Sequence, residues 1–251
     1  MSKPRIAVQL YSVRHEMEKD IPGTLKAVRD MGYEGVEFYG GYIRPEILLK
    51  SLDKTGLKIV GWHTPIANVM PGLIEAVITY NKKIGNNSLV VPALPAEYTS
   101  SKAGWLKAAG ILQAAGKRLA EEGMSTGYHN HHVEFSAVEG GIPWDIIAGA
   151  TDKNVVLQMD TGNCMHGNGD PLALMKKYPG RSQTIHLKPF SKKQEFATMI
   201  GSDDTNWQAV KEIGEGAGKT EWFIVEYECE TVYKPLEGID LCLKALKKAG
   251  Y

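Results

Sequence analysis

The sequence predicts an α/β fold, a single (β/α)8 TIM barrel, and three observations lead to this expectation. The 251 residues contain eight short, mostly apolar runs, as expected for parallel strands that are covered on both faces. Eight helical patterns alternate with these runs, and eight βα units in about 250 residues is the usual size of such a barrel. No linker or low-complexity segment divides the chain, so residues 1–251 are expected to form one domain.

The predicted strands are runs rich in branched and aromatic residues, bounded by glycine, proline or charged residues. In chain order they cover residues 5–10, 33–38, 57–62, 88–94, 124–129, 155–160, 183–188 and 222–227. Most of them lack the alternation of polar and apolar residues that is typical of a strand with one solvent-exposed face. They are therefore expected to pair in parallel beneath a layer of helices.

The predicted helices are marked by their ends and by their apolar spacing. Several open with proline and are followed by glycine, the residues that fit the first turn and the left-handed end of a helix. Apolar residues recur every three or four positions, as in Leu236, Ile239, Leu243 and Leu246. The expected helices cover residues 20–31, 45–55, 71–84, 102–122, 143–149, 171–178, 207–214 and 235–249.

A doubly wound open sheet is the alternative arrangement for alternating strands and helices. Its dinucleotide-binding version needs a glycine-rich turn after the first strand. Residues 11–19 contain no glycine, which favours the barrel.

The charge balance excludes some partners. Lys+Arg and Asp+Glu number 29 each, so neither nucleic acid nor an anionic membrane surface is expected to bind. No stretch approaches the roughly 18 apolar residues of a membrane span. Three cysteines, none in a CxxC spacing, indicate reduced thiols. The N-terminal segment becomes charged before any long apolar run, so no signal peptide is expected and the protein is predicted to be cytoplasmic.

Titratable residues gather after the predicted strands. The segment 128–135 carries three histidines and a glutamate directly after the fifth strand, a composition suited to holding a metal or moving a proton. All seven histidines are expected at or shortly after a strand end: His15, His63, His129, His131, His132, His166 and His186. The carboxyl ends of the strands form the active site of a TIM barrel, so these side chains are expected to converge there.

Two carboxylates strengthen the case for a metal. Asp160 and Glu226 end very apolar strands, where an unpaired charge is costly. Carboxylate and imidazole ligands converging on the barrel mouth predict one exchangeable divalent ion, with Mn²⁺, Co²⁺, Mg²⁺ and Zn²⁺ all compatible with the mixed donors.

Seven segments in this order resemble the sugar phosphate isomerase/epimerase-like proteins of the xylose-isomerase-like TIM barrel superfamily. They are IAVQLYSVR, GYEGVEFYG, LKIVGWHT, GYHNHHVEF, QMDTGN, IHLK and WFIVEYE. The resemblance runs from the first strand to the last helix. It implies a divalent metal held by Glu, Asp, His and Glu from strands five to eight.

Carried over by residue, the resemblance assigns Asp160, His186 and Glu226 as metal ligands. For the ligand after strand five, it favours Glu134 of the HNHxxE pattern, with His129 as the alternative. Glu134 and Glu226 are then also part of the catalytic machinery, and His131 is expected to be the base beside the metal.

Further residues at the strand ends are expected to contact substrate. Lys188, expected to be catalytic, and His63 would donate to sugar hydroxyls or to a developing oxyanion. Trp62 and Trp207 are candidates for stacking on a sugar face, although an aromatic residue at the rim is often only packing. The remaining expected substrate contacts are Arg14, Glu37, His129 and Asn163.

The function expected from this site is a metal-dependent sugar isomerase or epimerase. A base removes a proton next to a carbonyl, and the metal stabilises the resulting enediolate. Expulsion of a β-leaving group from the same intermediate would make the protein a lyase or dehydratase acting on a keto sugar or inosose. The expected substrate is an unphosphorylated sugar or keto sugar, and a homo-oligomer is left open.

Two further alternatives remain. A multi-metal endonuclease belongs to the same superfamily, but this chain has no basic patch for DNA. A barrel that binds sugar or metal without turnover is the alternative from another functional class.

Overall fold

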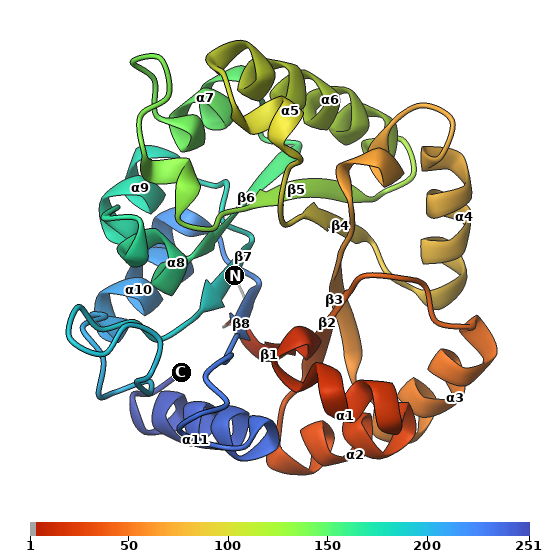
Figure 1. Cartoon of the computed structure of the whole chain (residues 1–251). Helices are drawn as coiled ribbons and strands as arrows, with labels where there is room; N and C mark the ends of the chain where they lie inside the picture. Colours follow the sequence, from red (N-terminus) through yellow and green to blue (C-terminus); the bar gives the residue numbers. More distant parts are fainter. Residues whose placement is uncertain (1–3) are drawn as a thin grey trace.

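The computed structural model describes residues 4–251 and shows a closed barrel of eight parallel strands (Figure 1). Each strand pairs with its sequence neighbour, and the last strand pairs with the first to close the ring. The strands are β1 (Arg5–Gln9), β2 (Gly35–Tyr39), β3 (Lys58–His63), β4 (Ser88–Val91), β5 (Ser125–His129), β6 (Val155–Asp160), β7 (Thr184–Leu187) and β8 (Trp222–Val225). The predicted (β/α)8 barrel is confirmed.

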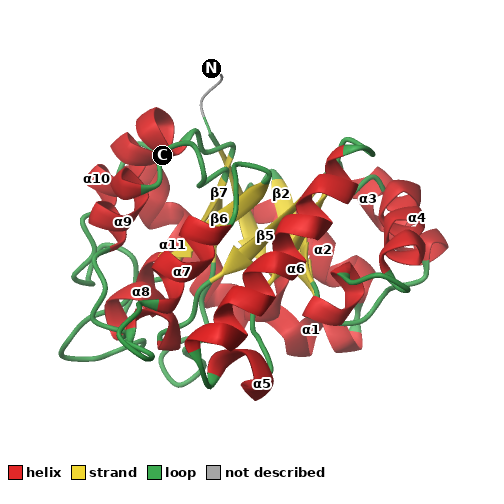
Figure 2. Ribbon diagram, turned by 90° about the horizontal axis from the view of Figure 1, so that it is seen from above, coloured by secondary structure: helices red, strands yellow, loops and turns green. Residues whose placement is uncertain are grey.

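Helices surround the barrel on its outside (Figures 1 and 2). Those predicted from the sequence are α2 (Ile21–Met31), α3 (Pro45–Thr55), α4 (Ile74–Ile84), α6 (Lys102–Ala120), α7 (Pro143–Ala150), α9 (Pro171–Lys177), α10 (Trp207–Ile213) and α11 (Pro235–Lys248). Gly32, Gly56 and Gly85 follow α2, α3 and α4 in the left-handed conformation, as the helix-end pattern indicated.

Short helices in the connections were not predicted, because each is too brief for an apolar period to appear. They are η1 (Leu10–Val13), α1 (Arg14–Lys19), η2 (Ile66–Val69), α5 (Ala96–Thr99), η3 (Val133–Phe135), α8 (Thr161–His166) and the π-helical turn η4 (Gly214–Gly218). Some strands also end earlier than expected. The fourth ends at Val91 because Pro92 has no N–H for the ladder.

The inside of the barrel is closed by a small apolar cluster, separate from the main core between strands and helices. Ala7, Val60, Trp222 and Ile224 form it. Val60 and Trp222 lie on strands that are not neighbours in the ring, so their contact crosses the interior. At Gly35 a Cβ would lie 2.5 Å from a Val60 methyl, so only glycine fits there. This apolar floor separates the two ends of the barrel.

Among residues 4–251, no helix combines the length and apolar character that crossing a membrane requires.

Candidate active site

The carboxyl ends of the strands open into a cavity of about 800 Å³. Among the predicted site residues, those that line it are His63, His129, His131, Asn163, Lys188 and Glu226. Four of the seven histidines are thus gathered at or under this cavity, when buried His186 is counted. His15, His132 and His166 are not part of it. His15 lies in α1 beside Glu230, and His132 packs near His166 outside the cavity.

His186 lies between two buried carboxylates. Its Nδ1 is 2.7 Å from Glu226 Oε2, and its Nε2 is 2.6 Å from Glu37 Oε2. Burial lowers the pKa of His186, but the negative charges of Glu37 and Glu226 outweigh it and raise the pKa to about 10. For Glu37 the effects have opposite signs: burial raises its pKa, but the nearby His63 and His186 outweigh burial and hold the pKa well below its usual range. The three groups form a row of two carboxylates with one imidazolium between them.

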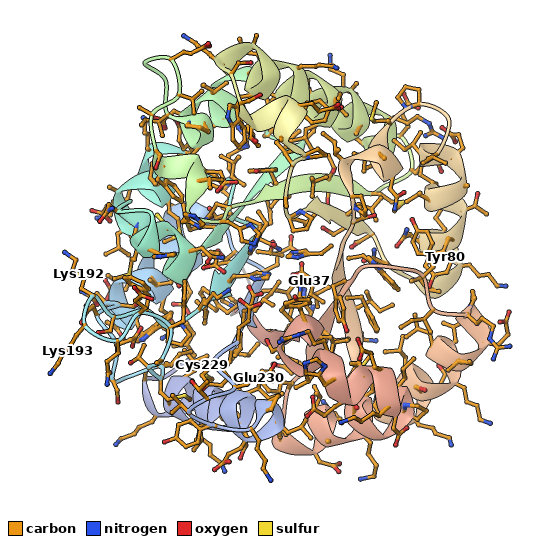
Figure 3. The ribbon with its side chains drawn as sticks, in the orientation of Figure 1. Glu37, Tyr80, Lys192, Lys193, Cys229 and Glu230 are labelled. Carbon is orange, nitrogen blue, oxygen red and sulfur yellow. The ribbon has the colours of Figure 1, made fainter. Side chains whose placement is uncertain are left out.

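Glu37 does not contact the cavity, contrary to the substrate-binding role expected of it. The side chain is fully buried near the barrel axis (Figure 3), beneath the histidines. It also accepts hydrogen bonds from Gln9 Nε2 (2.8 Å) and Gln158 Nε2 (2.9 Å). With His186 it therefore makes the layer under the site, where a carboxylate orients an imidazole rather than a substrate.

Gln158 is a site residue that the sequence patterns missed. Its Nε2 donates to Glu37 and to Thr184 Oγ1, both at 2.9 Å, so its Oε1 faces the histidines. That oxygen accepts from His63 Nε2 (2.8 Å) and His129 Nδ1 (3.1 Å). The available signal was its position two residues before Asp160, on the same face of β6.

His129 presents a free imidazole nitrogen to the centre of the site. Its Nδ1 is committed to Gln158, and its Nε2 lies 3.9 Å from Asp160 Oδ2. Burial lowers the pKa of His129 well below its usual value, and the charge of His186 adds to this effect. The ring is thus neutral, with the lone pair on Nε2 directed toward Asp160.

Asp160 has one oxygen without a partner. Oδ1 caps α8 by accepting the N–H of Asn163 at 2.7 Å, whereas Oδ2 is buried and has no hydrogen bond. Asn130 bridges the backbone of Asp160 from β5, with contacts of 2.9 and 3.1 Å. Burial raises the pKa of Asp160 to about 8. An orphaned buried carboxylate oxygen is costly, and a cation at this point would satisfy it.

The structure brings four donors from β5, β6, β7 and the end of β8 together. Ligand atoms of His129, Asp160, His186 and Glu226 all lie within 4.8 Å of one another. Two carboxylates and two imidazoles suit a divalent cation, with His129 Nε2 and Asp160 Oδ2 free and 3.9 Å apart. His186 would bind it through Nδ1, which must first release the proton now shared with Glu226. The residues present therefore fit one divalent ion.

Glu134 lies outside this group, which differs from the expectation that Glu134 rather than His129 supplies the donor after β5. The backbone after His129 folds back through η3, and both oxygens of Glu134 are used. Oε1 accepts from Tyr128 Oη (2.6 Å) and Oε2 from the N–H of His131 (2.8 Å). Glu134 thus holds the loop that presents His131.

Lys188 and His131 project from the wall of the cavity. Lys188 Nζ forms an ion pair with Glu228 and lies 3.9 Å from Glu226. Burial lowers the pKa of Lys188, and the charges of Glu226 and Asp160 more than reverse this, so the amine stays protonated. Burial lowers the pKa of His131. A cationic donor and a neutral imidazole therefore face the same space.

Three residues expected to bind substrate pack elsewhere. Trp207 is buried at the start of α10, with its Nε1 donating to Asp203 (2.8 Å). Trp62 is fully buried, stacked on Phe38 and bonded to the Gly40 carbonyl. Arg14 pairs with Glu230 and lies outside the cavity lining. The aromatic rings are packing residues, the alternative that the sequence had left open.

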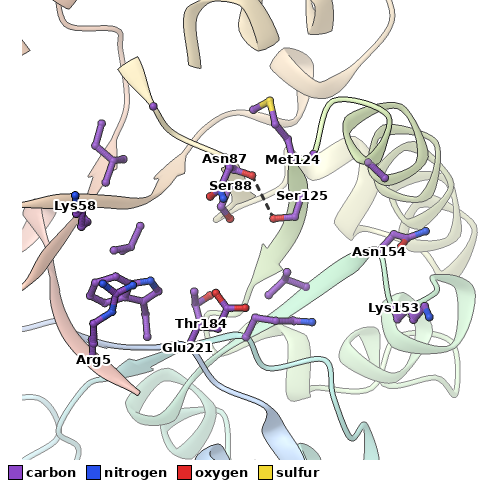
Figure 4. A pocket seen from close by; sticks show the side chains of 18 residues that line it. Arg5, Lys58, Asn87, Ser88, Met124, Ser125, Lys153, Asn154, Thr184 and Glu221 are labelled. Carbon is purple, nitrogen blue, oxygen red and sulfur yellow. Dashed lines mark hydrogen bonds between the residues drawn. The ribbon is translucent and has the colours of Figure 1, made fainter. Parts of the chain in front are cut away.

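A second cavity, of about 550 Å³, lies at the opposite end of the barrel (Figure 4). Its lining includes Arg5, Lys58, Asn87, Lys153 and Glu221. Arg5 stacks on the ring of Trp222 at 3.9 Å. None of the potential metal-holding groups found among the described residues lies here.

Comparison with known proteins gives the same fold throughout the chain. The family model described as "Xylose isomerase-like TIM barrel" matches residues 25–249. An inosose dehydratase from Clostridium perfringens is 26% identical over 185 residues, which cover 65% of this chain and 61% of the relative. The chain thus spans about three fifths of the length of that relative.

Solved structures superpose closely despite low identity. A sugar phosphate isomerase/epimerase from Parabacteroides distasonis has a TM-score of 0.86 at 22% identity, covering 99% of this chain and 95% of its own. An L-ribulose 3-epimerase has a TM-score of 0.67 at 13% identity, with 98% of each chain covered. At these identities the similarity shows the fold alone. The family match, the closed barrel and the donors at its carboxyl end agree, and the chain belongs to the xylose isomerase-like TIM barrel family.

Proposed function

We propose that this protein is a divalent-metal-dependent sugar isomerase or epimerase that removes a proton next to a carbonyl. The observation that carries the proposal is the convergence of His129, Asp160, His186 and Glu226 below an open cavity, with Asp160 Oδ2 buried and unpartnered. These four residues would hold the ion. When bound, a divalent ion polarises a carbonyl or a vicinal hydroxyl pair and stabilises negative charge that develops there.

The residues around the donors have distinct tasks. Glu37 accepts from His186 Nε2 and so orients the imidazole from below. Gln158 keeps hydrogen on His129 Nδ1 and leaves Nε2 free. Glu134 holds the backbone of His131 through an N–H contact of 2.8 Å. The geometry around the site is therefore maintained by hydrogen bonds that do not involve substrate.

His131 is the proposed base. It lies in the cavity wall next to His129, with ring centroids 5.2 Å apart, and its lowered pKa keeps the imidazole neutral and able to accept a proton. Lys188, held protonated by acidic neighbours, is the proposed donor to the substrate oxygen. Return of the proton to a neighbouring carbon gives isomerisation, and return to the opposite face gives epimerisation.

A β-elimination is the second candidate, and the inosose dehydratase relative favours it. Proton removal by His131 is common to both reactions. They differ in whether the electrons left on carbon recapture a proton or expel a leaving group from the next carbon.

The test starts with metal content. We expect about one divalent ion per chain by inductively coupled plasma mass spectrometry, lost in Glu226→Gln. Glu221→Gln is the matched control, because Glu221 precedes the same strand at the opposite end and lines the other cavity. A chain that takes up no Mn²⁺, Co²⁺, Mg²⁺ or Zn²⁺ would contradict the proposal.

Proton removal is measured next, by ¹H NMR of keto sugars in D2O with the metal-loaded protein. Exchange of the proton next to the carbonyl is expected for isomerisation, epimerisation and elimination alike. The product then separates them: a new sugar for the first two, and an unsaturated ketone for the third. Metal binding with no exchange for any keto sugar would favour the barrel that binds without turnover.

A further inference from the structure

One wall of the active-site cavity is apolar. The loops after β3 and β4 supply it, with Pro65, Ile66, Ala67, Ala93, Leu94 and Pro95. These two loops lie side by side because β3 and β4 are paired in the barrel. These six side chains offer no hydrogen-bond donor or acceptor, and the hydroxyl of Thr64, which lines the cavity beside them, is engaged by Asn68 Nδ2 at 2.6 Å. The hydroxyl groups of a sugar would find no hydrogen-bond partner on these six side chains.

The wall is exposed to whatever enters the cavity. Pro65, Ala67, Ala93 and Pro95 are all solvent-exposed, so their apolar surface is not used in packing the protein core. Water against such surface is unfavourable, and an apolar group that covers it gains in proportion to the area buried. The cavity therefore has a polar end at His131 and Lys188 and an apolar side suited to a different part of a ligand.

Aromatic rings continue the apolar wall. Tyr11 and Tyr39 line the cavity and meet edge to face, with centroids 5.2 Å apart and planes at 87°. Tyr11 is 40% exposed, so part of its ring is available to a ligand. Exposed tyrosine faces and edges stack favourably on another aromatic ring.

The cavity is large and poorly suited to a phosphate. Its volume of about 800 Å³ lies in the upper part of the roughly 300–1,000 Å³ range of sites for drug-sized ligands. Lys188 is its one lysine or arginine among the described lining residues, and it is already paired with Glu228. Lys192 and Lys193 point outward from the loop after β7 (Figure 3). Away from the metal donors, the described lining therefore offers a phosphate no unpaired cationic side chain.

From these observations we infer that the substrate is a glycoside: a neutral keto sugar that carries an aromatic substituent. The sugar would lie at His131 and Lys188, and the aromatic group between the β3 and β4 loops and Tyr11. The placement of the sugar rests on the proposed function. The place of the aromatic group rests only on the apolar wall.

The test compares matched ligands by isothermal titration calorimetry on the metal-loaded protein. The probes are phenyl and methyl β-glycosides of glucose, galactose and xylose. For at least one sugar, the phenyl glycoside is expected to bind about tenfold more tightly than the methyl glycoside, because only the phenyl group covers the wall. Equal affinities for every pair, or no binding of any phenyl glycoside, would overturn the inference.

Two substitutions localise the effect. Ala67→Asp and Ala93→Asp place a charge on the exposed apolar surface and are expected to reduce the phenyl preference to about twofold or less. Ala96→Asp is the control, because Ala96 is exposed at the start of α5 but does not line the cavity. A phenyl preference that survives both substitutions would mean that the ring binds elsewhere, and the inference would be wrong.

These results separate the inference from the proposed function. A phenyl preference without proton exchange would leave the aromatic site standing and contradict the enzyme. Proton exchange on simple keto sugars without a phenyl preference would support the proposed enzyme and contradict the aromatic site.

Discussion

The two ends of the barrel are built from the same strands but differ in how they hold charge. At the carboxyl end, charged side chains are buried and paired with one another, as in Glu37, His186 and Glu226. At the amino end, Lys58 and Lys153 line a cavity yet remain exposed to solvent. Both ends are hollow, so a cavity alone does not identify a site. Buried charge, which is expensive and is retained where chemistry needs it, marks the functional end.

The apolar floor keeps the two ends independent. Ala7, Val60, Trp222 and Ile224 fill the interior between them. Substitutions in this floor are expected to change stability, substitutions above it to change binding and turnover, and substitutions of exposed residues below it to change neither. The following predictions test this division, beginning with the largest effect.

Replacement of the proposed base should have the largest effect. His131→Ala is expected to slow proton exchange by about 10²–10⁴-fold, the usual contribution of a general base, and to leave metal content unchanged. His132→Ala is the matched control, because the adjacent histidine is exposed and lies outside the cavity. Equal losses in both variants, followed by NMR exchange rates, would remove His131 from the proposal.

Opening the apolar floor should affect stability instead. Trp222→Ala is expected to lower the free energy of unfolding by about 3–5 kcal/mol, because a large buried ring is removed from the apolar floor. Urea denaturation measures the loss, and Leu106→Ala, at a half-exposed position on α6, provides a mild comparison. Metal bound per folded chain should not change. If it falls, the two ends are coupled and the division fails.

Loss of the carboxylate beneath His186 should have an intermediate effect. Glu37→Gln is expected to weaken metal binding about 10–100-fold, since the partner that orients a ligating histidine is lost. Glu34→Gln, just before the same strand at the exposed amino end, should leave the affinity unchanged. Unaltered affinity in Glu37→Gln, by competition with a metal-sensitive dye, would show that His186 needs no such support.

The smallest effect is expected at the amino end. Lys153→Ala should change the free energy of unfolding by no more than about 0.5 kcal/mol, as is usual for an exposed side chain, with metal content and exchange rate unaltered. Reduced turnover in this variant would assign a function to the second cavity.

Much of this site could be predicted because strand ends in a parallel barrel meet at one place. That rule was enough to expect Asp160, His186 and Glu226 near one another, and the structure brings them within one group with His129. The rule says nothing about a loop that turns back. Glu134 follows the strand by five residues, and only the η3 turn directs its carboxylate to Tyr128 instead of the donors.

The roles of Gln158 and Trp207 depend on the direction in which each side chain points, and a local sequence pattern does not predict that direction. Gln158 reads as a polar interruption of an apolar strand, and its contact with Glu37 joins residues 121 positions apart. Trp207 stands near a rim in the sequence pattern, but its indole turns inward to Asp203. The periodicity of a helix or strand places a residue on one face of an element, whereas tertiary packing decides which partner its side chain contacts.

The amide of Gln158 has a consequence for how the site can vary. All of its hydrogen-bonding capacity is used. Its Nε2 donates to Glu37 and Thr184, and its Oε1 accepts from His63 and His129. A glutamate of the same shape would still accept from His63 and His129, but it would face Glu37 and Thr184 with a second acceptor instead of a donor. An isosteric change at position 158 would therefore set two acceptors against each other beneath the site and leave the hydrogen positions of both imidazoles as they are.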